Sequence, residues 1–478
     1  MVGKIRRKTR KKQANAAPKA WIISVDMGYG HQRAAYALRD IAYERIITAN
    51  TDTMISEKER KLWTRTRLIY DFFSKMREIP LIGKPIYAAY SQLYNIQPIF
   101  PYRDLSRPTY SVLEAKRYIT KGLCKDLIEY TAKKDIPVLT TFFIPALAFH
   151  YAGKEVYCVV TDYDHHRVWV PDNPKECKIT YFSPGKHASL RLLEYGVPEQ
   201  QIVETGFPLP KENIGEHDEI VKKDLLARLV NLDPRGVFFG KYKGMIEDKL
   251  LDGKKLQLHA LSRYKTHILT ITFMVGGAGA QKDIGIQIAT AFRRELTQGL
   301  IRLNLVAGTR IGVKNYFESE LRKIGLEVSA TKSVSILFAL DKEHYFDAVN
   351  AALRATDILW TKPSEMSFYN ALGIPIIIAP PIGDHENYNR EWLINIGSGV
   401  DQKNPLLANE WITYLIDEGW LADSAMQGFI DAPRTGTYRI EEYLAQHSML
   451  RPSRLAHRQS PLPAMHENIQ SGQPSGDS

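Results

Sequence analysis

Four short polar stretches contain the residue types that could carry chemistry. The first, VDMGYGHQRAA at residues 25–35, places Gly28, Gly30 and His31 directly after an apolar run. Glycines between a strand and a helix leave backbone N–H groups at the helix start, where a phosphate or a substrate oxygen is stabilised. A histidine there has a pKa suited to accepting a proton. Taken alone, the stretch favours a histidine that only caps or packs the helix start, with a catalytic corner as the alternative.

The same stretch argues against a nicotinamide or flavin cofactor. In a dinucleotide-binding fingerprint the third small residue would fall at Arg33, which breaks the pattern. We therefore expect no bound cofactor.

The second stretch is VTDYDHHRVWV at residues 160–170, which contains Trp169. Asp162 follows an apolar run whose carboxyl end is where ligands bind in open α/β sheets. Its carboxylate could orient a histidine or bind a sugar hydroxyl, or it could cap the next segment. His165 and His166 are adjacent and face different ways, so a metal held by both is not expected.

The remaining two stretches lie in the second half of the chain. VGGAGAQ at residues 275–281 is a run of small residues before a predicted helix, which lets backbone amides approach a diphosphate. A later helix has Ser364 as its start signal and Glu365 in its first turn. The loop GDHENYN at residues 383–389 brings acid and amide side chains to the same predicted sheet edge, where they could hydrogen bond a polyol.

Alternating strands and helices must position these stretches. We expect a helix over residues 31–46, from apolar residues spaced three and four apart, and further helices between the later runs. This alternation predicts an α/β fold with parallel, doubly wound sheets. The apolar runs that predict strands are residues 20–28, 136–143, 155–163, 177–184, 202–210, 267–277, 300–308, 355–362 and 374–381.

The pattern divides the chain into two Rossmann-like domains with flanking segments. We expect domains at residues 20–210 and 263–449, separated by a linker with an insertion at 211–262. A basic arm at 1–19 precedes them, and a tail at 450–478, too poor in apolar residues to fold, follows them.

Charge and cysteine usage limit the setting in which the protein works. Residues 4–12, KIRRKTRKK, supply seven Lys or Arg to the net charge of +11 and no acid. Such an arm can bind anionic lipid headgroups or nucleic acid, or be only a solvated tail. No signal peptide follows, and no run approaches the ~20 apolar residues that span a bilayer. The three cysteines, Cys124, Cys158 and Cys177, are far apart, which favours reduced thiols in a cytoplasm over disulfides or a zinc site.

In their order along the chain, the motifs resemble those of GT-B glycosyltransferases. They are most similar to the group of monogalactosyldiacylglycerol synthases and bacterial diacylglycerol glucosyltransferases. The amino-terminal motif of that group is matched by Gly28, Gly30, His31 and Ala35, with Asp26 before it. The later motifs are matched, from about residue 20 to 400 overall, by Thr161, Asp162, His166 and Trp169; by Thr205, Gly206 and Pro208; by Gly276, Gly277 and Gly279; and by Gly373, Pro375, Asp384, His385 and Asn389.

The chain departs from the family pattern at two positions. Five residues before Gly373, where the family has a ribose-binding Glu, this chain has Phe368. Glu365 lies three residues earlier on the same predicted helical face and could reach the ribose instead. The Gln of the family's Asp-His-Gln motif is Glu386 here, which adds negative charge near the donor sugar.

The resemblance implies two domains that face a cleft, with the acceptor on the amino-terminal side and a UDP-sugar on the carboxyl-terminal side. It implies metal-independent transfer of a hexose, with inversion, to an acceptor hydroxyl, and a membrane lipid such as diacylglycerol is the expected acceptor. His31 is the expected base, with Asp162 and His166 as alternates and Gly28, Gly30 and Trp169 near the acceptor. The expected donor residues are Gly276, Gly277, Gly279, Ser364, Glu365, Asp384, His385, Glu386 and Asn389.

The membrane expectation depends on the basic arm and on residues 57–100, which interleave cationic and aromatic side chains as an interfacial helix would. Ordinary amphipathic packing explains residues 57–100 equally well. We expect a cytoplasmic protein with peripheral contact at the inner face of the membrane and no nucleic-acid partner. Three alternatives stay open: a transferase for a soluble acceptor, a nucleotide-sugar epimerase, and a non-catalytic protein that binds a sugar nucleotide or a lipid.

Overall fold

The computed structural model describes residues 18–65, 96–274, 279, 281–328, 331–382 and 384–449. Most of the basic arm, Gly276, Gly277 and the tail lie outside these ranges, as does much of the stretch at 57–100. Within them, none of the helices has the length and apolar character that a membrane crossing requires.

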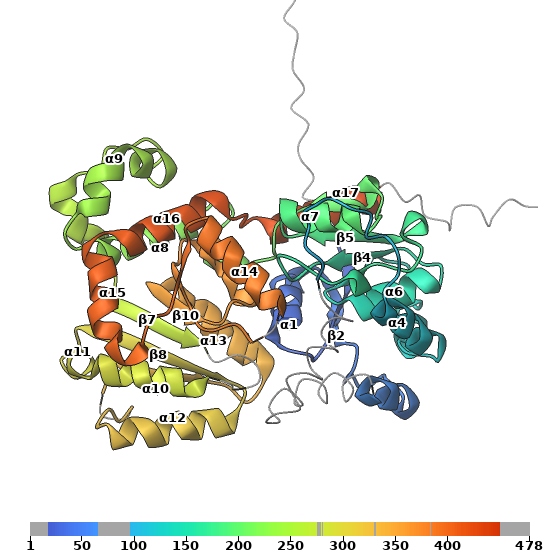
Figure 1. The fold of residues 1–478 in the computed structure, drawn as a ribbon, viewed down its shortest axis with the longest axis horizontal. Coiled ribbons are helices and arrows are strands. Elements are labelled where there is room, and N and C mark those ends of the chain that lie inside the picture. The colour runs from blue at the N-terminus through green and yellow to red at the C-terminus, as the bar shows by residue number, and fades with distance from the viewer. Residues whose placement is uncertain are drawn as a thin grey trace, which may run out of the picture.

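Two parallel six-stranded sheets organise the described chain (Figure 1). The first has the order β2-β1-β3-β4-β5-β6 and the second the order β12-β11-β10-β7-β8-β9. The strands of the first are β1 (Ala20–Ser24), β2 (Ala42–Thr48), β3 (Val138–Thr140), β4 (Val156–Val159), β5 (Ile179–Ser183) and β6 (Ile202–Glu204). Those of the second are β7 (Leu269–Met274), β8 (Ile301–Gly308), β9 (Val334–Phe338), β10 (Ile358–Thr361), β11 (Ile376–Ile378) and β12 (Gly399–Asp401).

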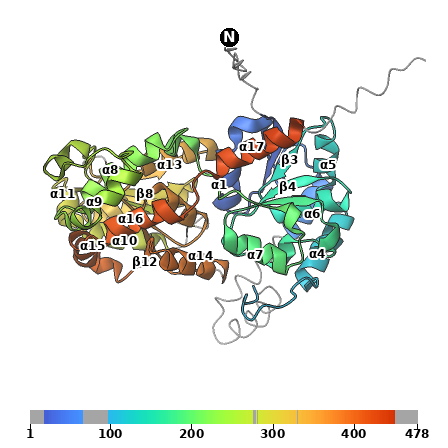
Figure 2. The ribbon, with the colours of Figure 1, turned by 90° about the horizontal axis from the view of Figure 1, so that it is seen from above.

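Helices flank both sheets (Figures 1 and 2). The α-helices of the first half are α1 (Tyr29–Ala37), α4 (Tyr110–Thr120), α5 (Lys125–Thr131), α6 (Phe143–Tyr151) and α7 (Lys186–Glu194). Those of the second half are α8 (Glu219–Leu232), α9 (Val237–Lys249), α10 (Lys282–Ala291), α11 (Arg293–Thr297), α12 (Ile311–Lys323), α13 (Lys342–Arg354), α14 (Asp384–Asn395), α15 (Ala408–Asp417), α16 (Trp420–Asp431) and α17 (Gly436–Met449). The 3-10 segments used below are η2 (Arg167–Trp169), η5 (Lys211–Asn213) and η7 (Glu365–Leu372).

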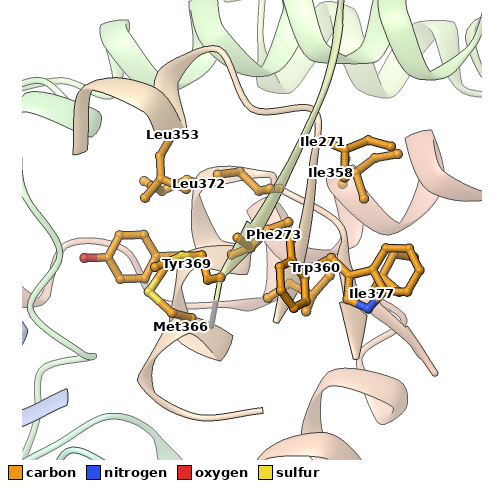
Figure 3. Close-up of a cluster of buried hydrophobic side chains, with 14 of the residues drawn as sticks. Ile271, Phe273, Leu353, Ile358, Trp360, Met366, Tyr369, Leu372 and Ile377 are labelled. Atoms are coloured by element: carbon orange, nitrogen blue, oxygen red, sulfur yellow. The ribbon is translucent and has the colours of Figure 1, made fainter. Parts of the chain in front are cut away.

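The strands are apolar runs because both faces of each sheet are covered. In the second sheet Ile271, Trp360 and Ile377 are all completely buried, and Figure 3 shows them packed with side chains from the neighbouring helices. Parallel sheets with helices on both faces bury their strands in this way. The predicted fold class, an α/β protein of the GT-B type with two Rossmann-like units, is confirmed.

In each sheet the chain order reverses beside the first strand of that half. The reversal lies between β1 and β3 in the first sheet and between β7 and β10 in the second. Ligands of open α/β sheets bind outside the carboxyl ends of the strands at such a reversal. The strand order therefore points to the loops after β1 and β3, and to those after β7 and β10, as the places to look for a site.

One predicted helix is divided in the structure. The helix expected over residues 31–46 ends at Ala37, and residues 42–48 form β2, which pairs in parallel with β1. The helical spacing held for only two turns. After it, the branched residues Ile46 and Ile47 favour a strand and pair with Ile22 and Ile23.

Two segments differ from the expected domain division. Residues 211–262 are more than a linker, because Val221, Leu225 and Leu229 of α8 are buried in the core of the second sheet. At the other end, α17 returns to the first sheet, where Ile440 and Leu444 are completely buried with its strands. Figure 1 shows α17 beside β5 and α7.

Candidate active site

His31 lies in the first turn of α1, at the carboxyl edge of the first sheet. The helix starts after Gly28, whose φ of +108° is a backbone conformation that favours glycine. The Nδ1 atom of His31 is 2.7 Å from the backbone oxygen of Thr141 and 3.1 Å from the Oγ1 atom of Thr161. A carbonyl oxygen only accepts, so Nδ1 carries the proton and the lone pair of the neutral ring is on Nε2. This is the tautomer that a general base at Nε2 requires.

Aromatic side chains hold the His31 ring in this orientation. Phe142 contacts it edge-on with centroids 4.8 Å apart, and the Trp169 ring is 6.3 Å away. Trp169 was expected near the acceptor, but it is only 3% exposed and packs behind His31. Its buried position suits the support of the histidine ring better than open contact with a ligand.

Thr141 is a site residue that the motif search did not select. It directly follows β3, and its Oγ1 also donates to the backbone oxygen of His31 at 2.8 Å. The available signal was the pair of threonines, Thr140 and Thr141, inside the apolar run at residues 136–143.

Asp162 and His166, the alternates to His31, are half-buried in the segment between β4 and η2. Asp164, which lies between them in the sequence, is completely buried. It accepts from both Nε and Nη2 of Arg191 at 2.8 Å and is 2.8 Å from Nε2 of His187. Burial alone would raise the pKa of Asp164, but these bonds hold it well below its usual range. Asp164 therefore anchors the loop rather than taking part in proton transfer.

The GYGH motif at residues 28–31 contacts the second unit directly. The Tyr29 hydroxyl is 3.1 Å from Oγ1 of Thr309, which follows β8. A Cβ atom on Gly30 would lie only 3.3 Å from Cβ of Glu365, the first residue of η7. A side chain here would require Glu365 to shift by a few tenths of an ångström, so the acceptor-side glycine and the expected donor carboxylate are neighbours.

The predicted diphosphate loop follows β7 at the order reversal of the second sheet. Gly279, with φ of +73°, is the described glycine of this loop, and Gln281 precedes α10. The Gln281 side chain donates to the backbone oxygen of Pro380 at 2.8 Å. This bond joins the glycine-rich loop to the segment that carries GDHENYN. Ser364, immediately before η7, and Asp384 and His385, at the start of α14, belong to the same edge of the sheet.

Glu386 was expected near the donor sugar, and the structure places it inside this edge. It is 1% exposed and forms an ion pair with Lys362, the residue after β10. Its second oxygen accepts from the backbone N–H of Ile382 at 2.7 Å. Glu386 therefore neutralises a lysine and fixes the loop before α14. Lys362, which the motif search did not select, belongs to the site.

Asn389 is also used within the protein. Its Oδ1 accepts from the backbone N–H of Tyr163 at 3.1 Å, and its Nδ2 donates to the backbone oxygen of Pro363 at 3.1 Å. Its side chain is completely buried. Asn389 thus joins the loop after β4 of the first unit to the end of β10 in the second.

Phe368 occupies a site that could not hold a ribose-binding carboxylate. Its ring stacks on Phe207 with centroids 4.5 Å apart and planes 5° apart, and it contacts Trp392 at 5.3 Å. Trp392 in turn stacks on Tyr163 of the first unit at 5.0 Å. The departure from the family pattern at residue 368 replaces a polar contact with an aromatic contact between the two units. Glu365 is the remaining carboxylate on η7.

Comparisons with known proteins found one matching family model and several sequence relatives that share the same name. Residues 259–442 match a family described as a domain of unknown function, DUF6938. The chain is 23% identical over 393 residues to the processive diacylglycerol beta-glucosyltransferase of Bacillus cytotoxicus, which covers 80% of this chain and 81% of the relative. The protein of that name from Bacillus cereus strain G9842 is 23% identical over 396 residues, with the same coverage.

Solved structures of low sequence identity also align with the chain. One is the S. aureus MnaA–UDP co-structure, with 13% identity, a TM-score of 0.44 and coverage of 91% of this chain and 97% of that one. Another is Acinetobacter baumannii MurG, with 12% identity, a TM-score of 0.42 and coverage of 90% and 100%. The fold assignment depends on the two sheets and the sequence relatives. The sequence comparison confirms the predicted resemblance and the predicted enzyme class: the chain is similar over most of its length to processive diacylglycerol beta-glucosyltransferases and is a glycosyltransferase.

Proposed function

We propose that this protein transfers a hexose from a UDP-sugar to the hydroxyl group of a membrane lipid such as diacylglycerol, with inversion at the anomeric carbon. The observation that carries the proposal is the placement of His31. Its Nδ1 is tied to the Thr141 carbonyl at the reversal of the first sheet, and its helix contacts Glu365 at the reversal of the second. The oriented His31 side chain therefore lies opposite the carboxyl edge of the second sheet, where a nucleotide is proposed to bind.

In the proposed reaction, Nε2 of His31 removes the proton of the acceptor hydroxyl as that oxygen attacks the anomeric carbon. The bond from this carbon to the β-phosphate oxygen breaks, and UDP leaves from the opposite face, so the configuration inverts. Thr141 and Thr161 keep His31 in the correct tautomer and also stabilise the protonated ring, since a backbone oxygen accepts from Nδ1 in both states.

The negative charge of the leaving UDP requires stabilisation on the second unit. The start of α10 after Gly279 directs backbone N–H groups toward the carboxyl edge of β7, where an anion is favoured. Glu365 is the proposed partner of the ribose hydroxyls, because Phe368 is enclosed by Phe207 and Trp392. The proposal includes no metal ion and no cofactor.

A lipid acceptor is supported by the names of the relatives and by one exposed surface of the first unit. Phe100 and Tyr102 are 67% and 65% exposed, and their rings contact each other at 4.8 Å. Arg103 follows them directly. Exposed aromatic rings beside a cation are suited to the interface of a membrane, where the rings insert and the charge contacts headgroups.

The test is UDP release from UDP-glucose and UDP-galactose, with and without diacylglycerol vesicles, together with mass analysis of the lipid. We expect release that depends on diacylglycerol and a glycolipid product. Free sugar and UDP without an acceptor would indicate the epimerase alternative. Release that depends only on a soluble acceptor would overturn the lipid part of the proposal. UDP binding with no turnover on any donor would indicate a binding protein.

The predicted role of the basic arm has its own test. Deletion of residues 1–19 removes eight Lys or Arg, the seven of residues 4–12 and Lys19, each of which contributes about 1 kcal/mol near an anionic surface. We expect the full chain to sediment with vesicles that contain anionic lipid and the deleted chain to stay largely in the supernatant. Neutral vesicles are the control, and equal sedimentation of both chains with anionic vesicles would exclude the arm.

A further inference from the structure

Arg33 is a buried cation that crosses from the first unit into the second. It lies on α1, one turn after Gly30, and is only 2% exposed. Its guanidinium is surrounded by aromatic rings of the second unit, with Tyr345, Phe346 and Tyr369 centroids at 5.4, 5.0 and 5.8 Å. Figure 3 shows Tyr369 at the edge of the second core, with its hydroxyl directed away from Trp360 and Ile377.

The hydrogen bonds of Arg33 do not compensate its burial. Nη2 donates to the Tyr345 hydroxyl at 3.0 Å, while Nε and Nη1 are buried with no hydrogen-bond partner among the described residues. A buried charge is costly unless an opposite charge or several hydrogen bonds accompany it. An arginine at this position therefore needs a reason other than stability.

The acidic side chain near Arg33 is Glu365. Burial alone would lower the pKa of Arg33, but its interactions with Tyr345, Tyr369 and Glu365 raise it above the ordinary value. Gly30 touches the same glutamate, because a Cβ there would lie 3.5 Å from Glu365 Oε2. Two residues one helical turn apart on α1 thus lie toward Glu365: Gly30 leaves room for the carboxylate, and Arg33 places a buried positive charge near it, without an ion pair between the two in the described residues.

We propose that Arg33 is a positioning residue of the donor site, which holds the Glu365 carboxylate ready for the nucleotide when the two units are closed on each other. This inference rests on the proposed function, since Glu365 is the proposed ribose partner. Its consequence is that the nucleotide binds well only when α1 of the acceptor-side unit is in place. Donor binding and the assembly of the acceptor side with His31, two residues away on the same helix, are thereby coupled.

The experiment compares UDP affinity, measured by calorimetry, in the wild type and in Arg33→Met, which keeps an unbranched side chain without charge. We expect UDP affinity to fall by at least about fivefold, the scale of coupling between contacting groups. The KM for the UDP-sugar should rise with it, while kcat changes less. Arg33→Lys should restore part of the affinity, because it returns the charge without the planar guanidinium.

A double-mutant cycle with Glu365→Gln separates positioning from a general loss of structure. If Arg33 acts through Glu365, Arg33→Met should change UDP affinity much less in the Glu365→Gln background. Arg39→Met is the matched control, because Arg39 also reaches across the boundary, to Glu212 of η5 at 3.0 Å, but is half-buried and has Glu212 rather than Glu365 as its acidic partner. It should leave UDP affinity unchanged.

The outcomes distinguish this inference from the proposed function. A wild type that does not bind UDP would overturn the proposed function itself. A wild type that binds UDP, with Arg33→Met binding equally well at an unchanged or lowered Tm, would overturn only the inference about Arg33 and leave it as a structural residue. Equal effects of Arg33→Met with and without Glu365→Gln would also overturn it.

Discussion

The order reversals of the two sheets carry polar groups that are held in different ways. At the first, His31 is oriented by a carbonyl and a hydroxyl, which are neutral partners. At the second, Lys362 and Glu386 neutralise each other. Neutral partners fix the direction of a histidine without forcing its charge, whereas a mutual ion pair removes both charges from any reaction. In the proposed mechanism, this difference favours proton transfer on the first unit and leaves backbone N–H groups and Glu365 for the nucleotide on the second.

The sharpest test of this comparison is His31→Ala. Loss of a general base lowers rates by about 10²–10⁴-fold, so we expect a kcat in that range below wild type. UDP affinity should stay within about twofold, because His31 lies on the first unit and UDP is proposed to bind the second. Replacing a neutral side chain changes binding at a separate site only slightly. Steady-state UDP release and calorimetry are the measurements. Wild-type turnover by the variant would remove His31 from the mechanism.

The Phe368→Glu variant tests whether the second unit can accommodate the glutamate that the resembling family has at this position. The carboxylate would enter the contact between Phe207 and Trp392, and we expect a loss of about 4 kcal/mol from burial of an unpaired charge and loss of a buried ring. UDP should bind no more tightly than in the wild type. Denaturant unfolding measures the first effect, with Phe368→Leu as a smaller apolar control. Tighter UDP binding at wild-type stability would contradict the structural role given to Phe368.

Lys362→Met tests the mutual neutralisation at the second reversal. It leaves Glu386 buried without its cation, and removal of one partner from a buried pair costs about 3–5 kcal/mol, which we expect at the lower end because Lys362 is 21% exposed. Glu386→Gln alone should cost less, because an amide needs no cation. The double variant should recover most of the stability lost in Lys362→Met. Additive losses would mean that the two side chains do not act as a pair.

The smallest effect concerns His165, which is buried beside the first reversal but not part of it. Burial lowers its pKa to about 3, and neither ring nitrogen has a hydrogen-bond partner in the part of the chain that the structure describes. As pH falls, His165 is protonated in the unfolded chain near pH 6.5 but in the folded protein only near pH 3. Its contribution to the free energy of unfolding is therefore complete above about pH 6.5 and is lost as pH falls toward 3. His165→Phe should remove up to about 1 kcal/mol per pH unit from the acid destabilisation between pH 6 and 4. Parallel stability curves for the two proteins would exclude the residue as a source of acid sensitivity.

Much of the fold was predictable because it depends on short-range pattern. Nine of the twelve strands that the structure describes lie in the predicted apolar runs, whereas β2, β9 and β12 were not predicted. The α/β alternation leaves few possible connections between them. The helix expected over residues 31–46 was wrong in its second half, since β2 exists only through its pairing with β1. The return of α17 to the first sheet was missed for the same reason: its apolar face could serve either core, and only the path of the chain selects one.

The sequence by itself determined which residue types are available at the strand ends: His31 in the glycine motif, the threonines within the run at 136–143, and the acids and amides of the second half. Only the tertiary structure decided their roles, because charge and hydrogen-bonding capacity are satisfied across space. It joined Thr141 and Thr161 to His31, paired Glu386 with Lys362, and enclosed Asn389 between the units. It also placed Arg33, which the sequence only marked as a departure from a glycine pattern, beside the rings of the opposite unit.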